Sequence, residues 1–93
     1  MPLEWDPKKA ASNIKKHGVS FEEAATVLQN RLADEFPDED HSFTEERWIA
    51  VGYSILGRIL VVCYADRPDA IRIISARRAT KQEIRDYETN EKA

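Results

Sequence analysis

The sequence predicts an α+β fold in which two N-terminal helices precede a four-stranded antiparallel sheet and a C-terminal helix. Helix-capping residues gather near the two ends of the chain, and the middle of the chain alternates apolar runs with turn residues, as strands do. The strand candidates follow one another without a helix between them, which favours antiparallel pairing over parallel crossovers. The 93 residues, 42% of them hydrophobic, fit a single domain over residues 1–93.

The first helix is expected over residues 7–16. Asp6 can cap its amino end, and Pro7 suits the first helical position because that position needs no backbone N–H donor. Gly18 follows as a natural helix stop, since glycine tolerates the left-handed conformation found there.

The second helix is expected to start at Ser20 and to end near Gln29. Ser20 and Glu23 have the spacing of a capping box. Phe21 and Leu28 fall on the same apolar side of this helix, which predicts the side that it buries. Both helices precede every strand in this expected order.

Four strands are expected over residues 32–36, 47–53, 58–65 and 71–75. Pro37 and the acidic residues after it end the first strand, and residues 54–57 form a hairpin-length link between the second and third. The unbroken apolar run of the third strand predicts a central position, covered on both faces. Residues 66–69 make the turn into the fourth strand.

The fourth strand carries arginines, so its side-chain alternation matters. Strict alternation sorts it into two faces, with Ile71, Ile73 and Ser75 on one and Arg72 and Ile74 on the other. Arg77 would then lie on the face opposite Arg72. Both arginines can reach one phosphate only if the chain turns at Ala76.

The last helix is expected to begin after Thr80, which forms a second capping box with Glu83. It continues through Ile84 and Tyr87 and frays over residues 89–93.

The charges are unevenly distributed, although the formal net charge is only -3. Residues 34–46 hold seven acidic side chains and no basic one, whereas residues 72–85 hold five basic side chains against Glu83 alone. The net charge argues against nucleic acid, but the basic stretch does not. The acidic stretch is either a solvated loop or a surface for a basic protein partner.

Several functional classes are excluded or disfavoured. Cys63 stands alone, so the chain forms no internal disulfide and no four-cysteine metal site. Phosphate-binding glycine loops, nucleophile motifs and metal-ligand spacings are absent, so we expect no cofactor and no metal. We find neither a secretory signal nor the ~20 apolar residues of a membrane span, and we therefore expect a cytoplasmic protein.

Residues 71–80 hold three arginines at the end of an apolar strand, directly before a capped helix. A guanidinium group is always charged, and its planar fork of donors matches phosphate. Two interpretations remain open. The arginines bind a phosphate backbone, or they form ion pairs with carboxylates of the same chain.

Segments along nearly the whole chain, from Trp5 to Tyr87, resemble the BrnT family of type II toxins. The resemblance is carried, in order, by residues 4–6, 16–24, Asp38 with His41, 46–47 and 72–79. It implies a small ribonuclease toxin with a RelE-like fold. It also implies neutralisation by a BrnA antitoxin with a ribbon-helix-helix DNA-binding part, assembled as a dimer of heterodimers that reaches operator DNA only through the antitoxin.

RNA can be cut without metal when its 2′-hydroxyl attacks the adjacent phosphorus, which requires a base, an acid and cations for the developing charge. The candidate phosphate-holding cations are Arg72 and Arg77. The candidate proton carriers are His41, Glu46 and Tyr87. Further RNA contacts are expected from Arg78, Arg47 and Lys81.

Each proton carrier also has a structural interpretation. His41 could cap a turn, and Tyr87 could pack its helix onto the sheet. Glu46 could form an ion pair with Arg72 on a neighbouring strand and so orient the arginine. The alternative to a ribonuclease is a non-catalytic protein-binding module or a co-repressor that acts only through its DNA-binding partner. Direct DNA binding is disfavoured because no helix-turn-helix pattern is present.

Overall fold

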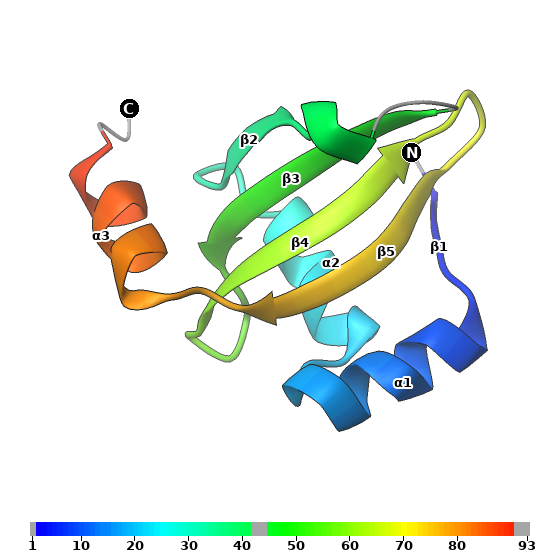
Figure 1. The fold of residues 1–93 in the computed structure, drawn as a ribbon, viewed down its shortest axis with the longest axis horizontal. Helices are drawn as coiled ribbons and strands as arrows, with labels where there is room; N and C mark the ends of the chain where they lie inside the picture. The colour runs from blue at the N-terminus through cyan, green and yellow to red at the C-terminus, as the bar shows by residue number, and fades with distance from the viewer. Residues whose placement is uncertain (1, 42–44, 91–93) are drawn as a thin grey trace.

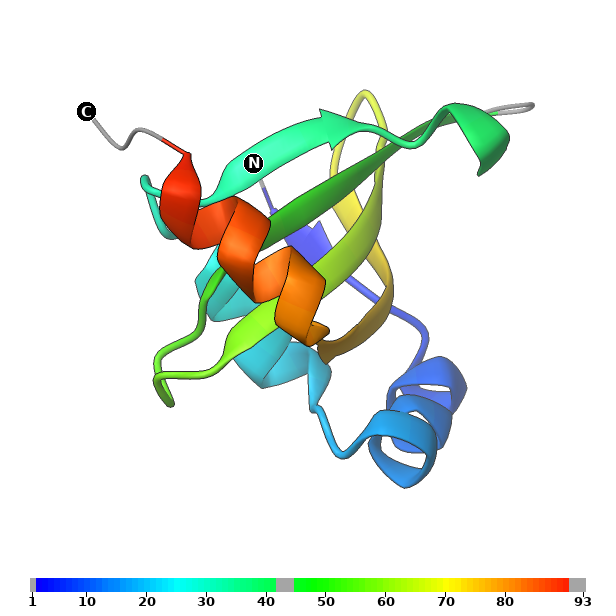
Figure 2. The same ribbon diagram turned by 60° about the vertical axis from the view of Figure 1, so that its left-hand side comes forward.

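The structure is a computed structural model that describes residues 2–41 and 45–90. A five-stranded sheet lies at its centre, with α1 and α2 on one face and α3 against the other (Figures 1 and 2). The strands lie in the order β1-β5-β4-β3-β2. The elements are β1 (Leu3–Glu4), α1 (Pro7–His17), α2 (Phe21–Leu28), β2 (Asp34–Pro37), the 3-10 helix η1 (Glu39–His41), β3 (Glu46–Tyr53), β4 (Ile59–Asp66), β5 (Ile71–Arg78) and α3 (Lys81–Thr89).

The sheet differs from the expected one by an added strand. β1 pairs in parallel with β5, placing Glu4 opposite Arg72, so the sheet is mixed and has five strands instead of four antiparallel ones. The expectation that both helices precede every strand was therefore wrong. A strand of two residues has no alternation to detect, and its partner is far away in the sequence.

The caps of α1 are those expected. Asp6 Oδ1 accepts a hydrogen bond of 2.8 Å from the Lys8 backbone N–H. Gly18 has a φ of 67°, and its N–H donates to the Ile14 carbonyl at 2.8 Å. A side chain at this left-handed position would be strained, which explains why the helix ends at a glycine.

Only half of the expected capping box forms at α2. Ser20 Oγ accepts from the Glu23 backbone N–H at 3.0 Å, as expected. The Glu23 carboxylate turns away to accept from Arg58 Nε at 3.0 Å and from Ser54 Oγ at 2.6 Å. The Arg58 guanidinium is a stronger partner for a carboxylate than a backbone N–H, and it lowers the pKa of Glu23. Glu23 thus fastens α2 to the β3–β4 hairpin.

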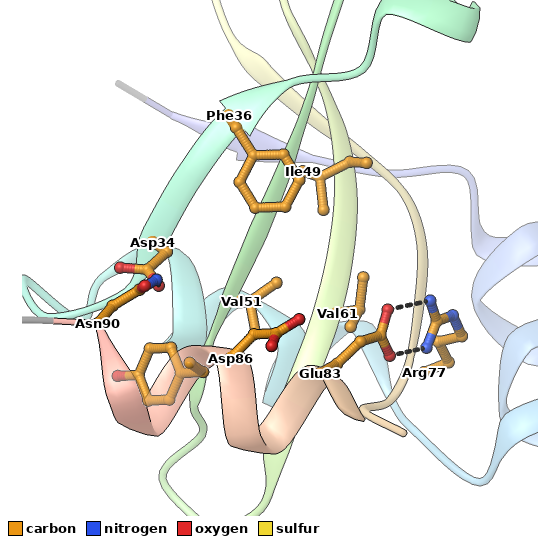
Figure 3. A pocket seen from close by; sticks show the side chains of 10 residues that line it. Asp34, Phe36, Ile49, Val51, Val61, Arg77, Glu83, Asp86 and Asn90 are labelled. Atoms are coloured by element: carbon orange, nitrogen blue, oxygen red, sulfur yellow. Dashed lines mark hydrogen bonds and ion pairs between the residues drawn. The ribbon is translucent and has the colours of Figure 1, made fainter. Parts of the chain in front are cut away.

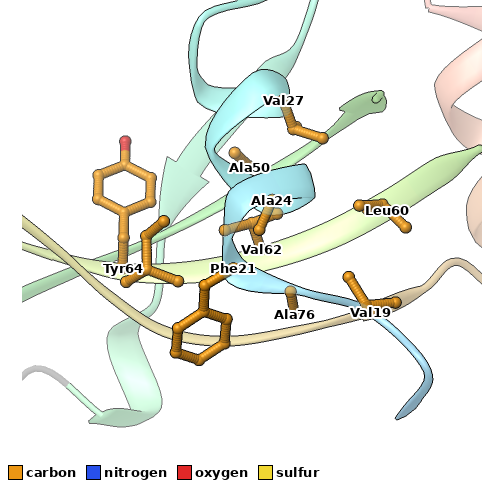
Figure 4. Packing of buried hydrophobic residues seen from close by; sticks show 10 residues of the cluster. Val19, Phe21, Ala24, Val27, Ala50, Leu60, Val62, Tyr64 and Ala76 are labelled. Carbon is orange, nitrogen blue, oxygen red and sulfur yellow. The ribbon is translucent and has the colours of Figure 1, made fainter. Parts of the chain in front are cut away.

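The main hydrophobic core lies between α2 and the sheet (Figure 4). Phe21, Ala24 and Val27 of α2 are fully buried against Leu60 and Val62 of β4. These positions repeat at helical spacing on α2 and at alternate residues on β4, which is why both elements present an apolar face here.

A smaller core lies under α3 on the opposite face. Val51, Ile59 and Val61 of the sheet are buried there together with Tyr87 of α3. Figure 2 shows α3 lying across one end of this face. The rest of the face continues beyond the helix towards the β4–β5 turn.

β5 contains an irregularity that decides where its arginines point. Cys63 of β4 pairs with Ser75, but the next residue of β4, Tyr64, pairs with Ile73, so Ile74 is an extra residue in β5. Such a β-bulge shifts the alternation of side chains by one. Ser75 consequently shares a face with Arg72, contrary to the strict alternation expected from the sequence.

The bulge also replaces the expected turn at Ala76. β5 continues through Ala76 to Arg78, three residues beyond its expected end at Ser75. Arg77 pairs with Val61, on the same face as Arg72.

In the part of the chain that the structure describes, no helix is both long and apolar enough to cross a lipid bilayer.

Candidate functional site

The candidate site lies on the sheet face against which α3 packs, called here the α3 face. The strand register brings rows of side chains onto it, and three of these rows position the arginines. Next to α3 the row is Val51, Val61 and Arg77; the middle row is Ile49, Cys63 and Ser75; the far row is Arg47, Ala65 and Arg72. A row without charged side chains therefore separates Arg77 from the arginines of the far row.

The far end of the α3 face holds an arginine cluster, defined as Arg47, Arg67 and Arg72. Arg72 Nη1 donates to Glu4 Oε2 at 2.8 Å, and Arg67 Nε donates to Glu45 Oε2 at 3.1 Å. Arg67 also lies 3.7 Å from Glu4, and Arg47 lies 3.4 Å from Glu45. The three guanidinium groups thus lie together around the carboxylates of Glu4 and Glu45.

Arg77 lies beside α3 and is held by Glu83 in a bidentate pair. Its Nη1 and Nη2 donate to Glu83 Oε1 and Oε2 at 2.8 and 2.9 Å. Glu83 Oε1 also accepts from the Thr80 backbone N–H at 2.8 Å, which completes the expected capping box of α3. These bonds, that from Arg77 above all, lower the pKa of Glu83 to about 2.

The two arginines chosen from the sequence share a face but hold separate positions. Arg72 pairs with Ala65 and Arg77 with Val61, four residues apart on β4, which corresponds to about 13 Å along the strand. Their guanidinium groups contact different carboxylates at the two ends of the face. This arrangement suits two phosphates of one nucleic acid strand better than a single phosphate.

A cavity of about 170 Å³ lies on the α3 face between β2 and α3 (Figure 3). Phe36, Ile49, Val51 and Val61 give it apolar walls, and carboxylate and amide side chains from β2 and α3 give it polar ones. The lining residues are Asp34, Phe36, Ile49, Val51, Val61, Arg77, Glu83, Asp86, Tyr87 and Asn90. The bidentate pair of Arg77 and Glu83 closes one end of it (Figure 3).

Two of the predicted site residues lie on the other face. Glu46 alternates with Arg47 and so points towards the α1 and α2 side. Arg78 pairs with Leu60, a residue of the main core, and lies close enough to lower the pKa of Glu23. The expected ion pair between Glu46 and Arg72 does not form, because β4 separates β3 from β5 and Arg72 pairs with Glu4.

Tyr87 and Lys81 both belong to α3 but differ in burial. Tyr87 is 6% exposed, and its hydroxyl donates to the Leu32 carbonyl at 3.0 Å. Its ring meets Tyr53 edge to face at 5.9 Å between centroids. Lys81 is the exposed first residue of the helix. Tyr87 therefore packs α3 onto the sheet, as its structural interpretation expected. A role for Tyr87 in proton transfer stays a prediction.

His41 is the last residue of η1, and its side chain lies outside what the structure describes. The sequence reasoning missed Glu4, Glu45 and Arg67. Arg67 falls in the turn expected over residues 66–69, and nothing local in the sequence links it to Glu4, which precedes it by more than sixty residues. Among the described residues, no three histidine, cysteine or acidic side chains gather closely enough to hold a metal ion.

Residues 5–83 match the family model of the ribonuclease toxin BrnT of type II toxin-antitoxin systems. The chain belongs to the BrnT family. The matched range contains the arginine cluster, Arg77 and Glu83, and it stops before Tyr87. A type II family of this kind implies that a BrnT chain has a protein antitoxin as its partner.

A solved BrnT structure agrees with this assignment. The chain resembles the crystal structure of the Brucella abortus ribonuclease toxin BrnT with a TM-score of 0.68 and 28% sequence identity. The similarity covers 87% of this chain and 99% of the Brucella chain. No curated protein sequence matches the chain. The α+β fold with three helices is thus shared with a BrnT toxin.

Proposed function

We propose that this BrnT chain is a RelE-like endoribonuclease that cleaves RNA without a metal ion, inhibits translation and arrests growth. A BrnA-like ribbon-helix-helix antitoxin neutralises it in the cytoplasm, as a dimer of heterodimers that contacts operator DNA only through the antitoxin. Residues 1–93 form one toxin domain. One observation carries the proposal: the β5 bulge unites Arg72 and Arg77 with Arg47 and Arg67 on a single face of the sheet.

The arginines divide the work along the RNA strand. Arg77 holds the phosphate that is cut and stabilises the charge that develops when the 2′-hydroxyl attacks phosphorus. The arginine cluster holds another phosphate of the same strand, because its three guanidinium groups lie together at the far end of the face. The half-buried strip around Cys63 lies between these two positions.

Arg77 must exchange its partner for this to occur. A phosphate offers two oxygens in the same bidentate geometry as the Glu83 carboxylate, so it can replace that carboxylate on the guanidinium. The exchange is feasible because the Arg77 side chain is 42% exposed. Arg78 and Lys81 are proposed to contact RNA beyond the α3 face.

His41 is the proposed proton carrier, because an imidazole titrates near neutral pH, at a pKa of ~6.5. Glu46 and Tyr87 are the alternatives to be tested beside it. Glu46 points to the opposite face of the sheet, and the Tyr87 hydroxyl already bonds the Leu32 carbonyl, so His41 is preferred to both.

A non-catalytic binding module is the second candidate function, and one observation favours it. Arg72 and Arg77 already form ion pairs with Glu4 and Glu83 inside the chain. Arginines that serve only to hold β1 and α3 against the sheet would show the same contacts. In that case the chain would bind its antitoxin and repress its operon through it without touching RNA.

Purified toxin should be incubated with total RNA in excess EDTA, with wild type, Arg72→Ala, Arg77→Ala and His41→Ala compared at equal folding. Each arginine variant is expected to lose ~10²-fold or more in cleavage rate, the usual effect of removing one transition-state charge partner. Arg31→Ala is the matched control, because Arg31 is an exposed arginine in the turn between α2 and β2.

Each outcome separates the candidates. Cleavage by wild type and Arg31→Ala but not by Arg77→Ala supports a metal-independent ribonuclease with Arg77 in its site. Cleavage that EDTA abolishes would contradict metal independence. If wild type cleaves nothing, either alone or with ribosomes, and its expression without antitoxin does not arrest growth, the non-catalytic module is correct.

A further inference from the structure

The cavity between β2 and α3 differs in charge from the arginine cluster on the same face. Asp34, Glu83 and Asp86 line it, against the single cation Arg77, which Glu83 already binds. Asp86 Oδ1 accepts from the neutral amide of Gln82 at 2.9 Å, and among the described residues Asp86 has no ion pair. The carboxylates of this rim would attract a cation.

The walls of the cavity are apolar and partly aromatic. Phe36 is 44% exposed although its ring is large, and Ile49, Val51 and Val61 continue the apolar surface across the sheet. Figure 3 shows Phe36 and Ile49 at one end and Asp86 on the side of α3. An aromatic face attracts a cation, and an apolar wall accepts the methylene stem of a long basic side chain.

We propose that this cavity receives an arginine or lysine side chain of the protein antitoxin, an inference that rests on the toxin-antitoxin part of the proposed function. The stem of the side chain packs on Val51 and Phe36, and its charged head bonds the Asp86 carboxylate at the rim. A partner held here lies beside the pair of Arg77 and Glu83, since both residues line the same cavity.

This placement gives a physical account of neutralisation. The antitoxin anchors at the acidic end of the α3 face and covers Arg77, while RNA phosphates are drawn to the arginine cluster at the other end. The two ligands therefore compete for the middle of one face. Their attachment points carry opposite charge, so each can be weakened separately.

The test measures the affinity of full-length toxin for its full-length cognate antitoxin by isothermal titration calorimetry at two salt concentrations. Asp86→Asn is expected to weaken the complex by about tenfold or more, because it removes the charge of a desolvated ion pair. Phe36→Leu keeps an apolar wall but removes the ring, and it should weaken the complex by about threefold or more. Glu22→Gln is the matched control, since Glu22 is exposed on the opposite side, on α2.

A double-mutant cycle then identifies the partner side chain. Each arginine and lysine of the antitoxin is replaced by alanine and measured against wild type and Asp86→Asn. One of these cations should lose its effect in the Asp86→Asn background. If every antitoxin cation acts independently of Asp86, or if Asp86→Asn and Glu22→Gln bind equally well, the proposal is wrong.

RNA cleavage by the same variants is the second readout. If Asp86→Asn and Phe36→Leu change the preferred cleavage site while antitoxin affinity is unchanged, the cavity holds an RNA base and the antitoxin proposal fails. If wild type cleaves no RNA but the cycle still shows coupling at Asp86, the ribonuclease proposal fails and this inference holds. Circular dichroism and thermal unfolding confirm that the variants are folded.

Discussion

Asn13 holds Ala76 by both of its backbone groups. Asn13 Nδ2 donates to the Ala76 carbonyl at 2.7 Å, and Asn13 Oδ1 accepts from the Ala76 N–H at 3.2 Å. Nδ2 also donates to the Val19 carbonyl at 2.9 Å. β1 pairs with β5 only as far as Arg72. Further along β5, the Asn13 side-chain amide bonds the backbone of Ala76 as a neighbouring strand would. It thereby fixes the backbone immediately before Arg77.

Asn13→Ala is expected to lower the free energy of unfolding by about 2 to 4 kcal/mol, because it leaves a buried N–H and buried carbonyls without their partners. Urea unfolding followed by circular dichroism measures the loss. Ser12→Ala is the control, since Ser12 is the exposed neighbour on the same helix. A loss equal to that of Ser12→Ala would show that the Asn13 amide does not hold β5.

Glu83 should make part of the stability depend on pH. The folded-state pKa of Glu83 is about 2, below its ordinary value of 4.5, because Arg77 bonds its carboxylate. A lowered pKa adds stability above pH 4.5, and that stability is lost as the pH falls towards 2. The side chains are 42% and 33% exposed, so solvent screening limits the contribution to about 1 kcal/mol.

Glu83→Gln tests this dependence, because glutamine keeps the capping geometry but has no charge. Wild type should lose about 1 kcal/mol more than Glu83→Gln when the free energy of unfolding is compared at pH 6 and pH 2.5. Glu22→Gln should behave like wild type. Identical pH profiles for wild type and Glu83→Gln would mean that the pair with Arg77 does not stabilise the fold.

Arg72→Ala should change stability little. The side chains of Arg72 and Glu4 are 27% and 40% exposed, and ion pairs at such positions contribute at most about 1 kcal/mol. Thermal unfolding should therefore shift by only a few degrees, even where RNA cleavage is lost. A large fall in the melting temperature would instead assign Arg72 to holding β1 on the sheet.

Cys63 offers a direct probe of the α3 face. It is the single cysteine of the chain and is half-buried in the middle row, paired with Ile49 and Ser75. RNA that spans the two arginine positions must cover it. Alkylation by iodoacetamide should slow several-fold when a 2′-O-methyl RNA that cannot be cut is added.

The matched control for this labelling is Arg77→Ala with the same RNA. That variant should lose the protection, measured as the ratio of its alkylation rates without and with RNA. The ratio is needed because Arg77 interacts electrostatically with Cys63, so its removal also changes the free rate. Unchanged labelling of wild type at saturating RNA would place the RNA on another surface.

The sequence was sufficient to predict the helices because their ends are set by neighbouring residues. Asp6, Gly18 and Thr80 cap as expected, and each contact spans only a few residues. Glu23 shows the limit of such reasoning. Its carboxylate bonds Arg58, thirty-five residues away, and the tertiary contact prevails over the local cap.

The arginine site needed information that local patterns do not contain. The extra residue Ile74 depends on the register between β4 and β5, so parity alone placed Arg72 and Arg77 on opposite faces. The partner of Arg72 comes from β1, a strand too short to show a period. The sequence was sufficient to predict that these arginines meet anionic groups, but it did not predict which carboxylates lie beside them.

The Glu83 carboxylate accepts hydrogen bonds from two groups, the Thr80 backbone N–H at the start of α3 and the guanidinium of Arg77. Any anion that takes Arg77 alters the carboxylate on which the first turn of the helix depends. By thermodynamic reciprocity, whatever loosens that turn must also change how tightly Arg77 binds anions. The order of α3 and the occupancy of the arginine are therefore a single linked equilibrium, in which the state of one reports on the other.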